Sequence, residues 1–156
     1  MEVTTSISGT ELVVSRLRQL PEKLGRNAMR RALRKGANVI RDQARANAKT
    51  LDDNLTREAI WKNITTQGGG RRRERREGGP IMRVGVMGGA RSRGGDPSAP
   101  GGDTFYWRYL EFGTSEMAAK PFLRNALASS VEKSISTTIE AMQVETAKEL
   151  AKMGVR

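Results

Sequence analysis

Residues 106–115 read YWRYLEFGTS, and residues 120–127 read KPFLRNAL. All three phenylalanines, both tyrosines and one of the two tryptophans of the chain fall between residues 105 and 122. The alternation of large side chains over 105–112 predicts a strand, Gly113 predicts a turn, and Pro121 suits the first turn of a helix. No nucleophile, general base or metal ligand accompanies these aromatic residues. The segment therefore predicts packing and assembly rather than chemistry.

The composition of the chain excludes several classes of function. A chain of 156 residues predicts one domain spanning 1–156, and a hydrophobic share of 37% predicts a thin core. The absence of cysteine and histidine excludes zinc sites of the usual kind and Ser-His or Cys-His machinery. Carboxylate-only or lysine-based catalysis is left open, but no such constellation is visible and no phosphate-binding glycine loop fits its pattern. We expect that the protein is not an enzyme and that it binds no cofactor and no metal.

The sequence also argues against a membrane protein and against a secreted protein. No apolar run approaches the roughly 20 residues that a membrane helix needs. The first five residues lack the basic and then apolar pattern of a signal peptide. We therefore expect no membrane partner and a protein that is made and used in the cytoplasm.

A long basic helix is predicted between Pro21 and Lys49. Small or aliphatic residues recur along it at i+4 steps, namely Leu24, Ala28, Ala32, Gly36, Ile40, Ala44 and Ala48. Alanine and glycine let a second element approach closely, while arginines and lysines occupy the other faces. A second long helix is predicted from Pro121, with an apolar stripe of Leu123, Leu127, Val131, Ile135, Ile139 and Met142.

Strands are predicted at residues 2–8, after Ile60, at 81–87 and at 105–112. The resulting fold class is α+β, with a small antiparallel sheet of three to four strands packed against two long helices. Two glycine- and arginine-rich segments, 68–79 and 88–104, are predicted as flexible arms, and the first is expected to be disordered or to form a long hairpin tip.

The net charge of +11 directs attention to the basic residues. A basic surface binds nucleic acid, an anionic membrane or an acidic protein. The candidates for contact with DNA or a partner are Arg30, Arg34, Arg41, Arg71, Arg72, Arg73, Arg75 and Arg76. Three interpretations of the run 71–76 stay open: an arginine-rich nucleic-acid arm, a solvated loop, and an arm that docks on an acidic neighbouring subunit.

Glu111 is a lone carboxylate between the aromatic residues and Gly113. Without a partner acid it is a poor sign of a hydrolase. An ion pair with Arg108 or Arg124, or a cap for backbone N–H groups, is the expected role.

The order of these segments resembles the tail-component family of neck or tail-completion proteins from long-tailed, lambdoid-type bacteriophages. The specific part of the resemblance is the motif Glu111, Phe112, Gly113 and Thr114 followed by Pro121, Phe122, Leu123 and Arg124. The resemblance covers most of residues 7–130. The chain departs from the family pattern where Tyr106-Trp107 replaces a Tyr-Ala pair, where Asn54 replaces a glycine, and in the arm 71–77.

The resemblance implies a structural virion protein that acts as a tail-completion or head–tail joining subunit. Its implied partners are copies of itself in a ring of six, or alternatively twelve, and neighbouring head-completion, tail-terminator or tail-tube proteins. Genomic DNA in the lumen would be met without sequence specificity. The implied location is the neck or tail of the virion. The alternative function left open is a basic nucleic-acid-binding accessory protein.

Overall fold

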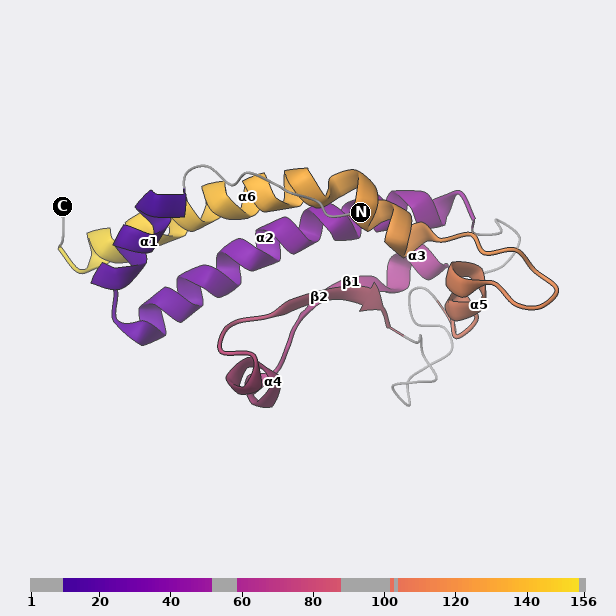
Figure 1. The fold of residues 1–156 in the computed structure, drawn as a ribbon, viewed down its shortest axis with the longest axis horizontal. Helices are drawn as coiled ribbons and strands as arrows, with labels where there is room; N and C mark the ends of the chain where they lie inside the picture. The colour runs from indigo at the N-terminus through magenta and orange to yellow at the C-terminus, as the bar shows by residue number, and fades with distance from the viewer. Residues whose placement is uncertain (1–9, 52–58, 88–101, 103, 155–156) are drawn as a thin grey trace. The chain divides into compact units, whose positions relative to one another are not determined.

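The computed structural model describes residues 10–51, 59–87, 102 and 104–154 of the chain (Figure 1). Its elements run in the order α1 Thr10–Gln19, α2 Glu22–Lys49, α3 Ile60–Asn63, β1 Ile64–Gly68, α4 Arg71–Arg76, β2 Met82–Val86, α5 Trp107–Phe112 and α6 Phe122–Lys152. The contacts divide these elements between two units. Unit 1 draws on residues 1–37, 68–83 and 132–156, and unit 2 on 38–67 and 84–131. Each unit therefore contains part of α2 and part of α6.

The described residues are mostly helical and contain one sheet of two antiparallel strands, β1 and β2. The α+β class with two long helices is confirmed, but the prediction of three to four strands is wrong. The strand predicted at residues 2–8 lies outside the described residues. None of the described helices combines the length and the apolar character needed to cross a membrane.

Residues 107–112 form the helix α5 and not the predicted strand. A short apolar run does not distinguish strand from helix by alternation alone, because both spacings fit within six residues. In the helix, Trp107 and Leu110 pack against the core, whereas Tyr109 and Phe112 are exposed. The i, i+3 spacing of the two core residues is the helical signal that the alternation concealed.

The small-residue stripe of α2 is buried as predicted, with Ala28, Ala32, Ala44 and Ala48 inaccessible to solvent. In unit 1, Gly36 of α2 lies against α6, and the Ser134 hydroxyl donates to the carbonyl oxygen of Gly36 at 2.9 Å. A Cβ atom on Gly36 would lie 1.9 Å from Oγ1 of Thr138 and 2.7 Å from the carbonyl oxygen of Ser134. The two backbones are therefore too close for any side chain at this position.

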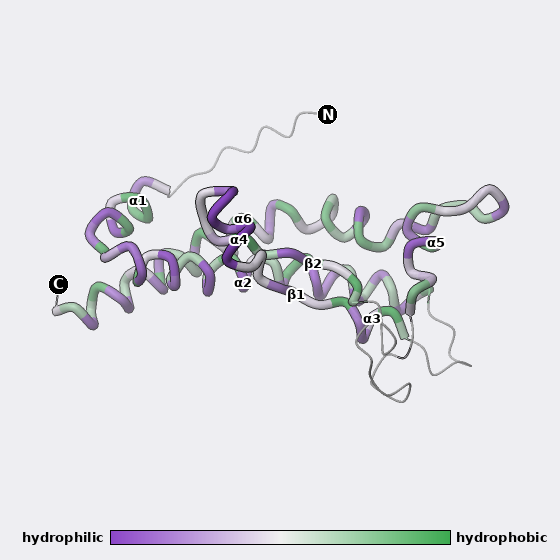
Figure 2. The backbone as a smooth tube through the Cα atoms, turned by 90° about the horizontal axis from the view of Figure 1, so that it is seen from below, coloured by the Kyte–Doolittle hydropathy of each residue, from purple (hydrophilic) through white to green (hydrophobic). Residues whose placement is uncertain are grey.

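The buried stripe of α6 is not the predicted apolar one. The buried residues of α6 are Phe122, Ala126, Ser130, Ser134, Ala141, Glu145, Thr146, Glu149 and Leu150. The predicted stripe lies one position further along, so Leu127 is 50% exposed. The hydropathy colouring in Figure 2 shows the same mixture of apolar and polar residues along α6. The reason is steric, since a helix that approaches α2 this closely in unit 1 accommodates small and hydroxyl side chains better than leucine or isoleucine.

Buried carboxylates complete the packing of α2 and α6 within unit 1. The Arg31 guanidinium donates to Glu145 at 2.5 Å and also to Glu149. The ammonium of Lys35 lies 3.2 Å from the Glu145 carboxylate. These contacts lower the pKa of Glu145 from 4.5 to about 2, and the hydrogen bond from Arg31 has the largest effect. The same guanidinium lowers the pKa of Glu149.

The core of unit 2 is a compact group of buried residues from both long helices, α3 and β1. Its members are Ala44, Ala48, Ile60, Ile64, Phe122 and Ala126. The backbone hydrogen bonds from Gly69 to Ile81 and from Met87 to Asn63, each 2.9 Å, set the strand register. In this register Val84 and Val86 share a face with Ile64 and pack against the core.

The two predicted arms differ in the structure. Residues 68–79 form the tip of the β1–β2 hairpin and include α4, so the hairpin interpretation describes them and disorder does not. Most of 88–104 lies outside the described residues. Two of its residues are held by Asn63, whose amide nitrogen donates to the Gly102 carbonyl at 3.2 Å and to the Thr104 hydroxyl at 2.8 Å.

The close approach at Gly36 predicts opposite effects for two glycines of α2. We expect Gly36→Ala to lower the free energy of unfolding by about 1–3 kcal/mol, because the added methyl group overpacks the contact with α6. Gly25→Ala is the matched control, because its Cβ would meet atoms no nearer than 3.7 Å. It should raise stability by about 0.5–1 kcal/mol through helix propensity. Urea unfolding followed by circular dichroism measures both, and equal effects would contradict the close approach.

The lowered pKa values predict acid sensitivity. The folded state holds Glu145 ionised down to about pH 2. Its contribution to the free energy of unfolding is therefore fully present above the pKa of the unfolded chain, which is near 4.5. The contribution is lost as the pH falls through the interval between these values. We expect the free energy of unfolding to fall steeply below about pH 4.5. Glu145→Gln should flatten this fall, whereas Glu132→Gln, at an exposed position of α6, should leave it unchanged. Equal slopes for wild type and Glu145→Gln would refute the assignment.

Candidate functional site

The Glu111 carboxylate closes the N-terminus of α6 from another element. It is 1% exposed, at the end of α5. One carboxylate oxygen accepts the backbone N–H of Leu123 at 2.9 Å, and the other accepts that of Arg124 at 3.0 Å. The first N–H groups of a helix have no partner within the helix, and negative charge is favourable there. Glu111 therefore acts as a cap supplied from 12 residues upstream.

Arg124 joins the same contact from the α6 side. Its Nε donates to the Glu111 carboxylate at 3.2 Å, and a second guanidinium nitrogen donates to the Glu111 backbone carbonyl. Its Cζ lies 5.3 Å from the ring centroid of Phe112. Of the two partners considered from the sequence, Arg124 is the one that contacts Glu111. Arg108 instead lies over the ring of Trp107.

The turn between α5 and α6 needs a glycine at position 113. Gly113 has a φ angle of 77°, and a Cβ atom there would lie 2.9 Å from both the Met117 carbonyl oxygen and the Ala119 nitrogen. The Thr114 hydroxyl accepts the backbone N–H of Met117 at 3.0 Å and so closes the loop. The loop then returns to α5 through a 2.7 Å hydrogen bond from the Lys120 N–H to the Leu110 carbonyl.

The remaining motif residues place α6 in the core of unit 2. Pro121 comes immediately before the first residue of α6 and does not lie within the helix. Phe122 is the largest fully buried side chain of the described residues, and Leu123 packs against the same core. The structure thus brings all eight predicted motif residues into one joint between α5 and α6, in which their contacts are structural.

Three exposed aromatic side chains lie in or just before α5. Phe105, Tyr109 and Phe112 are 60%, 51% and 64% exposed. We call these three residues the aromatic patch. Aromatic side chains are enriched in protein–protein interfaces, so these residues are candidates for contact with another chain.

The predicted basic contact residues fall into two groups. Three of them are engaged within the chain, since Arg30 binds Glu74, Arg41 binds Asp42, and Arg76 binds Glu77. Among the described residues, no ion pair involves the other five, which are Arg34, Arg71, Arg72, Arg73 and Arg75. All five are exposed. Four of these five arginines lie in α4 at the hairpin tip.

Glu74 is a buried carboxylate that was not among the residues predicted from the sequence. It is buried although its neighbours in α4 are all exposed arginines. The guanidinium of Arg30 donates to both of its carboxylate oxygens, once at 3.3 Å and once at a shorter distance. This contact is the main reason why the pKa of Glu74 is lowered. The sequence did not reveal this contact, because an acid inside an arginine run also suits a solvated helix.

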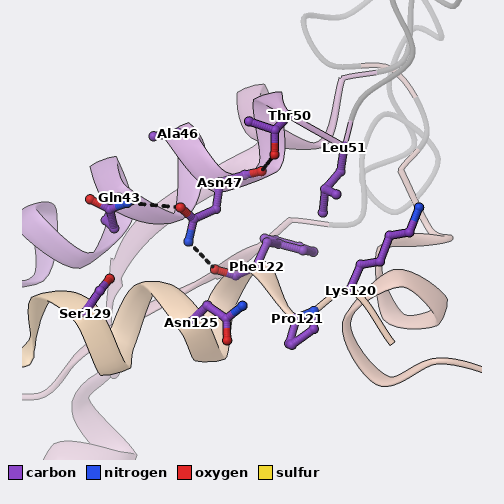
Figure 3. Close-up of a pocket in the computed structure, with 10 residues that line it drawn as sticks. All are labelled: Gln43, Ala46, Asn47, Thr50, Leu51, Lys120, Pro121, Phe122, Asn125 and Ser129. Carbon is purple, nitrogen blue, oxygen red and sulfur yellow. Dashed lines mark hydrogen bonds between the residues drawn. The ribbon is translucent and has the colours of Figure 1, made fainter. Parts of the chain in front are cut away.

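A hollow of about 660 Å³ lies in unit 2 between α2 and the segment 120–129 (Figure 3). Asn47 joins its walls by donating to the Phe122 carbonyl at 3.1 Å and accepting from the Gln43 amide at 3.0 Å. Lys120 is the one charged side chain in its lining. A single ammonium among amides and hydroxyls provides no acid–base pair. The described residues also contain no group of three or more His, Cys, Asp or Glu side chains that could hold a metal ion.

Comparison with protein families matches residues 13–113 to the family described as "Bacteriophage HK97-gp10, putative tail-component". The matched segment is about two thirds of the 156 residues. The chain belongs to this family, which confirms the resemblance drawn from the sequence. The match includes Glu111, Phe112 and Gly113 and ends before Pro121. No curated protein and no solved structure matches the chain.

Membership of the family identifies the chain as a structural component of a bacteriophage tail or neck. It also places the protein in the virion.

The cap at α6 predicts a large loss of stability for Glu111→Ala. The change leaves two backbone N–H groups and the Nε of Arg124 without their acceptor, and we expect a loss of about 2–4 kcal/mol. Glu116→Ala, at an exposed position of the same loop, should change stability by less than about 0.5 kcal/mol. Urea unfolding with unchanged m-values measures both. A Glu111→Ala protein as stable as Glu116→Ala would show that the cap contributes nothing.

Proposed function

We propose that the protein is a ring-forming subunit of the phage neck that completes the tail or joins it to the head. The partners in this proposal are identical copies in a ring of six, or alternatively twelve, together with adjacent head-completion, tail-terminator or tail-tube proteins. The protein acts by assembly and carries out no catalysis. Family membership supports the tail or neck role, and the surface of unit 2 supports the assembly role.

The observation that carries the proposal is the aromatic patch. Three large aromatic residues lie exposed between positions 105 and 112, within the segment that the family match covers. An interface between unlike surfaces of identical subunits closes into a ring when the rotation between them closes. The patch supplies one such surface, and the neighbouring subunit covers it.

The composition of the core supports the same conclusion. Buried hydrophobic residues are mostly alanine, and several buried positions of α6 are polar. Such a core contributes less apolar burial than one built from leucine and isoleucine. Burial of the aromatic patch between subunits adds the apolar area that the isolated chain lacks.

Positive charge supports contact with the genome in the lumen of the ring. The chain carries 28 basic and 17 acidic residues, and phosphate contacts need no sequence readout. A second candidate function, a basic nucleic-acid-binding accessory protein, is supported by the exposed arginines of α4. Deletion of 71–76 discriminates between the two. An accessory protein would lose DNA binding while particle joining continued, whereas a joining subunit would lose particle joining.

The assembly proposal predicts an oligomer that depends on the aromatic patch. We expect native mass spectrometry to show a closed ring for the wild-type protein. Tyr109→Ser combined with Phe112→Ser should raise the dissociation constant at least about tenfold, since each 1.4 kcal/mol of binding free energy corresponds to a factor of ten. The matched control is Leu12→Ser combined with Val14→Ser, two exposed apolar residues of α1.

The same variants test the role in the particle. A phage from which the gene is deleted should accumulate separate heads and tails, counted by electron microscopy, and the wild-type chain should restore joined virions. The aromatic-patch variant should restore few of them and the α1 control many. A wild-type protein that stays monomeric and never enters particles would overturn the proposal.

A further inference from the structure

The tip of the β1–β2 hairpin has a defined backbone at both ends of α4. Gly70, before the helix, and Gly78, after it, have φ angles of 79° and 78°. The N–H of Gly79 donates to the Glu74 carbonyl at 3.0 Å, and that of Glu77 donates to the Arg73 carbonyl at 3.0 Å. The first of these bonds, with a glycine of positive φ inside it, is the Schellman arrangement that ends many helices. The arginine run is therefore held in shape.

Glu74 attaches this tip to α2 within unit 1. It is the buried side chain of α4, and its two carboxylate oxygens accept hydrogen bonds from two nitrogens of the Arg30 guanidinium. The two-pronged contact with Arg30 fixes the orientation of α4 as well as its position. We call the pair Arg30–Glu74 the latch.

The latch determines where the arginines point. At roughly 100° per residue, the arginines of α4 occupy an arc of about 200° centred opposite Glu74. Arg71, Arg72, Arg73, Arg75 and Arg76 are all exposed. Figure 2 shows α4 as a hydrophilic segment along its length. The contact between Arg76 and Glu77 is also exposed, so a stronger anion can replace it.

The described part of a second copy offers little to neutralise this arc. Among the acidic residues that the structure describes, Glu74, Glu111, Glu145 and Glu149 are buried in internal contacts. Glu22, Asp42 and Glu77 already lie beside arginines of the chain. The other described acids are exposed, namely Glu11, Glu116, Glu132 and Glu140. They stand on separate turns and loops, and identical subunits with a net charge of +11 repel one another. To be neutralised, the arc needs closely spaced negative charge, which the described part of a second copy does not supply.

Duplex DNA fits that requirement. Its phosphates supply one negative charge for about every 1.7 Å of helix axis. The residues of α4 include no aromatic side chain for stacking and no amide for reading base edges. Contact would therefore be limited to the backbone and independent of sequence.

We propose that the β1–α4–β2 hairpin is a preorganised grip for the phosphate backbone of duplex DNA, and that the Arg30–Glu74 latch holds its arginines in the binding orientation. The identity of this DNA as the phage genome rests on the proposed neck function, whereas the binding itself is a property of the chain. Glu74 is a positioning residue and does not contact DNA.

The first test concerns the arginines. Purified full-length protein is titrated with a 30-base-pair duplex of mixed sequence at several salt concentrations. Arg72→Gln combined with Arg73→Gln should weaken binding about tenfold or more and reduce the salt slope by about 1.8, or about 0.9 for each phosphate that is no longer neutralised. The matched control, Arg18→Gln combined with Lys23→Gln, removes the same charge from exposed positions elsewhere in unit 1. Equal effects in both variants would overturn the proposal.

The second test concerns the latch. Removing a negative charge ordinarily strengthens binding to DNA, and Glu77→Gln, at an exposed site in the hairpin, should leave affinity unchanged or slightly raised. Glu74→Gln should instead weaken binding by about threefold or more and lower the salt slope, because the arginines lose their common orientation. Circular dichroism and urea unfolding establish that each variant is folded. Glu74→Gln binding as tightly as Glu77→Gln would refute the role of the latch.

A third arm separates DNA from an acidic protein partner. Polyglutamate replaces the duplex in the same titrations. Hairpin variants that lose binding to polyglutamate while keeping wild-type affinity for DNA would overturn the proposal in favour of an acidic partner. None of these measurements requires ring formation, so a negative result here leaves the neck function standing. A protein that stays monomeric but binds DNA through the hairpin would support the DNA-binding proposal and contradict the ring.

Discussion

The close approach of α2 and α6 is the constraint on which the rest of the structure depends. In unit 1, Gly36 lies so near α6 that a methyl group would meet the Thr138 hydroxyl at 1.9 Å. In unit 2, Ala44 and Ala48 of α2 share a core with Phe122 and Ala126 of α6. Small residues allow the helices to approach, and the approach in turn keeps large residues out. The aliphatic side chains of α6 are consequently displaced to a half-buried position, and little apolar area remains for a conventional core.

Buried carboxylates supply the specificity that such a core cannot. Glu145 and Glu149 bind Arg31 between the long helices of unit 1. Glu74 binds Arg30 and orients the hairpin tip. Glu111 caps α6 and binds Arg124 in unit 2. A buried carboxylate with its cation and N–H donors in place tolerates few other arrangements, because each alternative leaves a charge unpaired in a low-dielectric environment. Each carboxylate thus selects one arrangement of the elements it joins.

The two surfaces that remain suit a protein that works by assembly. Unit 2 exposes the aromatic patch, and unit 1 exposes the arginines of α4. Within the described part of the chain, most of the acids that could balance these arginines are bound to other cations. In our proposals, the apolar surface contacts a protein and the basic surface contacts a polyanion. Both surfaces exist because the internal contacts neither cover the aromatic side chains nor pair most of the arginines of α4.

The sequence by itself determined the two long helices, the stripe of small residues on α2, the strands β1 and β2, and the family. These features depend on local periodicity and on a motif that can be read residue by residue. It did not determine whether 107–112 is strand or helix, since six residues satisfy both spacings and only packing of Trp107 and Leu110 selects the helix. It also misplaced the buried face of α6, because hydrophobicity suggests which residues prefer burial but not how closely the partner helix approaches. The role of Glu74 came from the tertiary structure alone: Arg30 lies 44 residues away in the chain, and only the folded hairpin brings the two charges together.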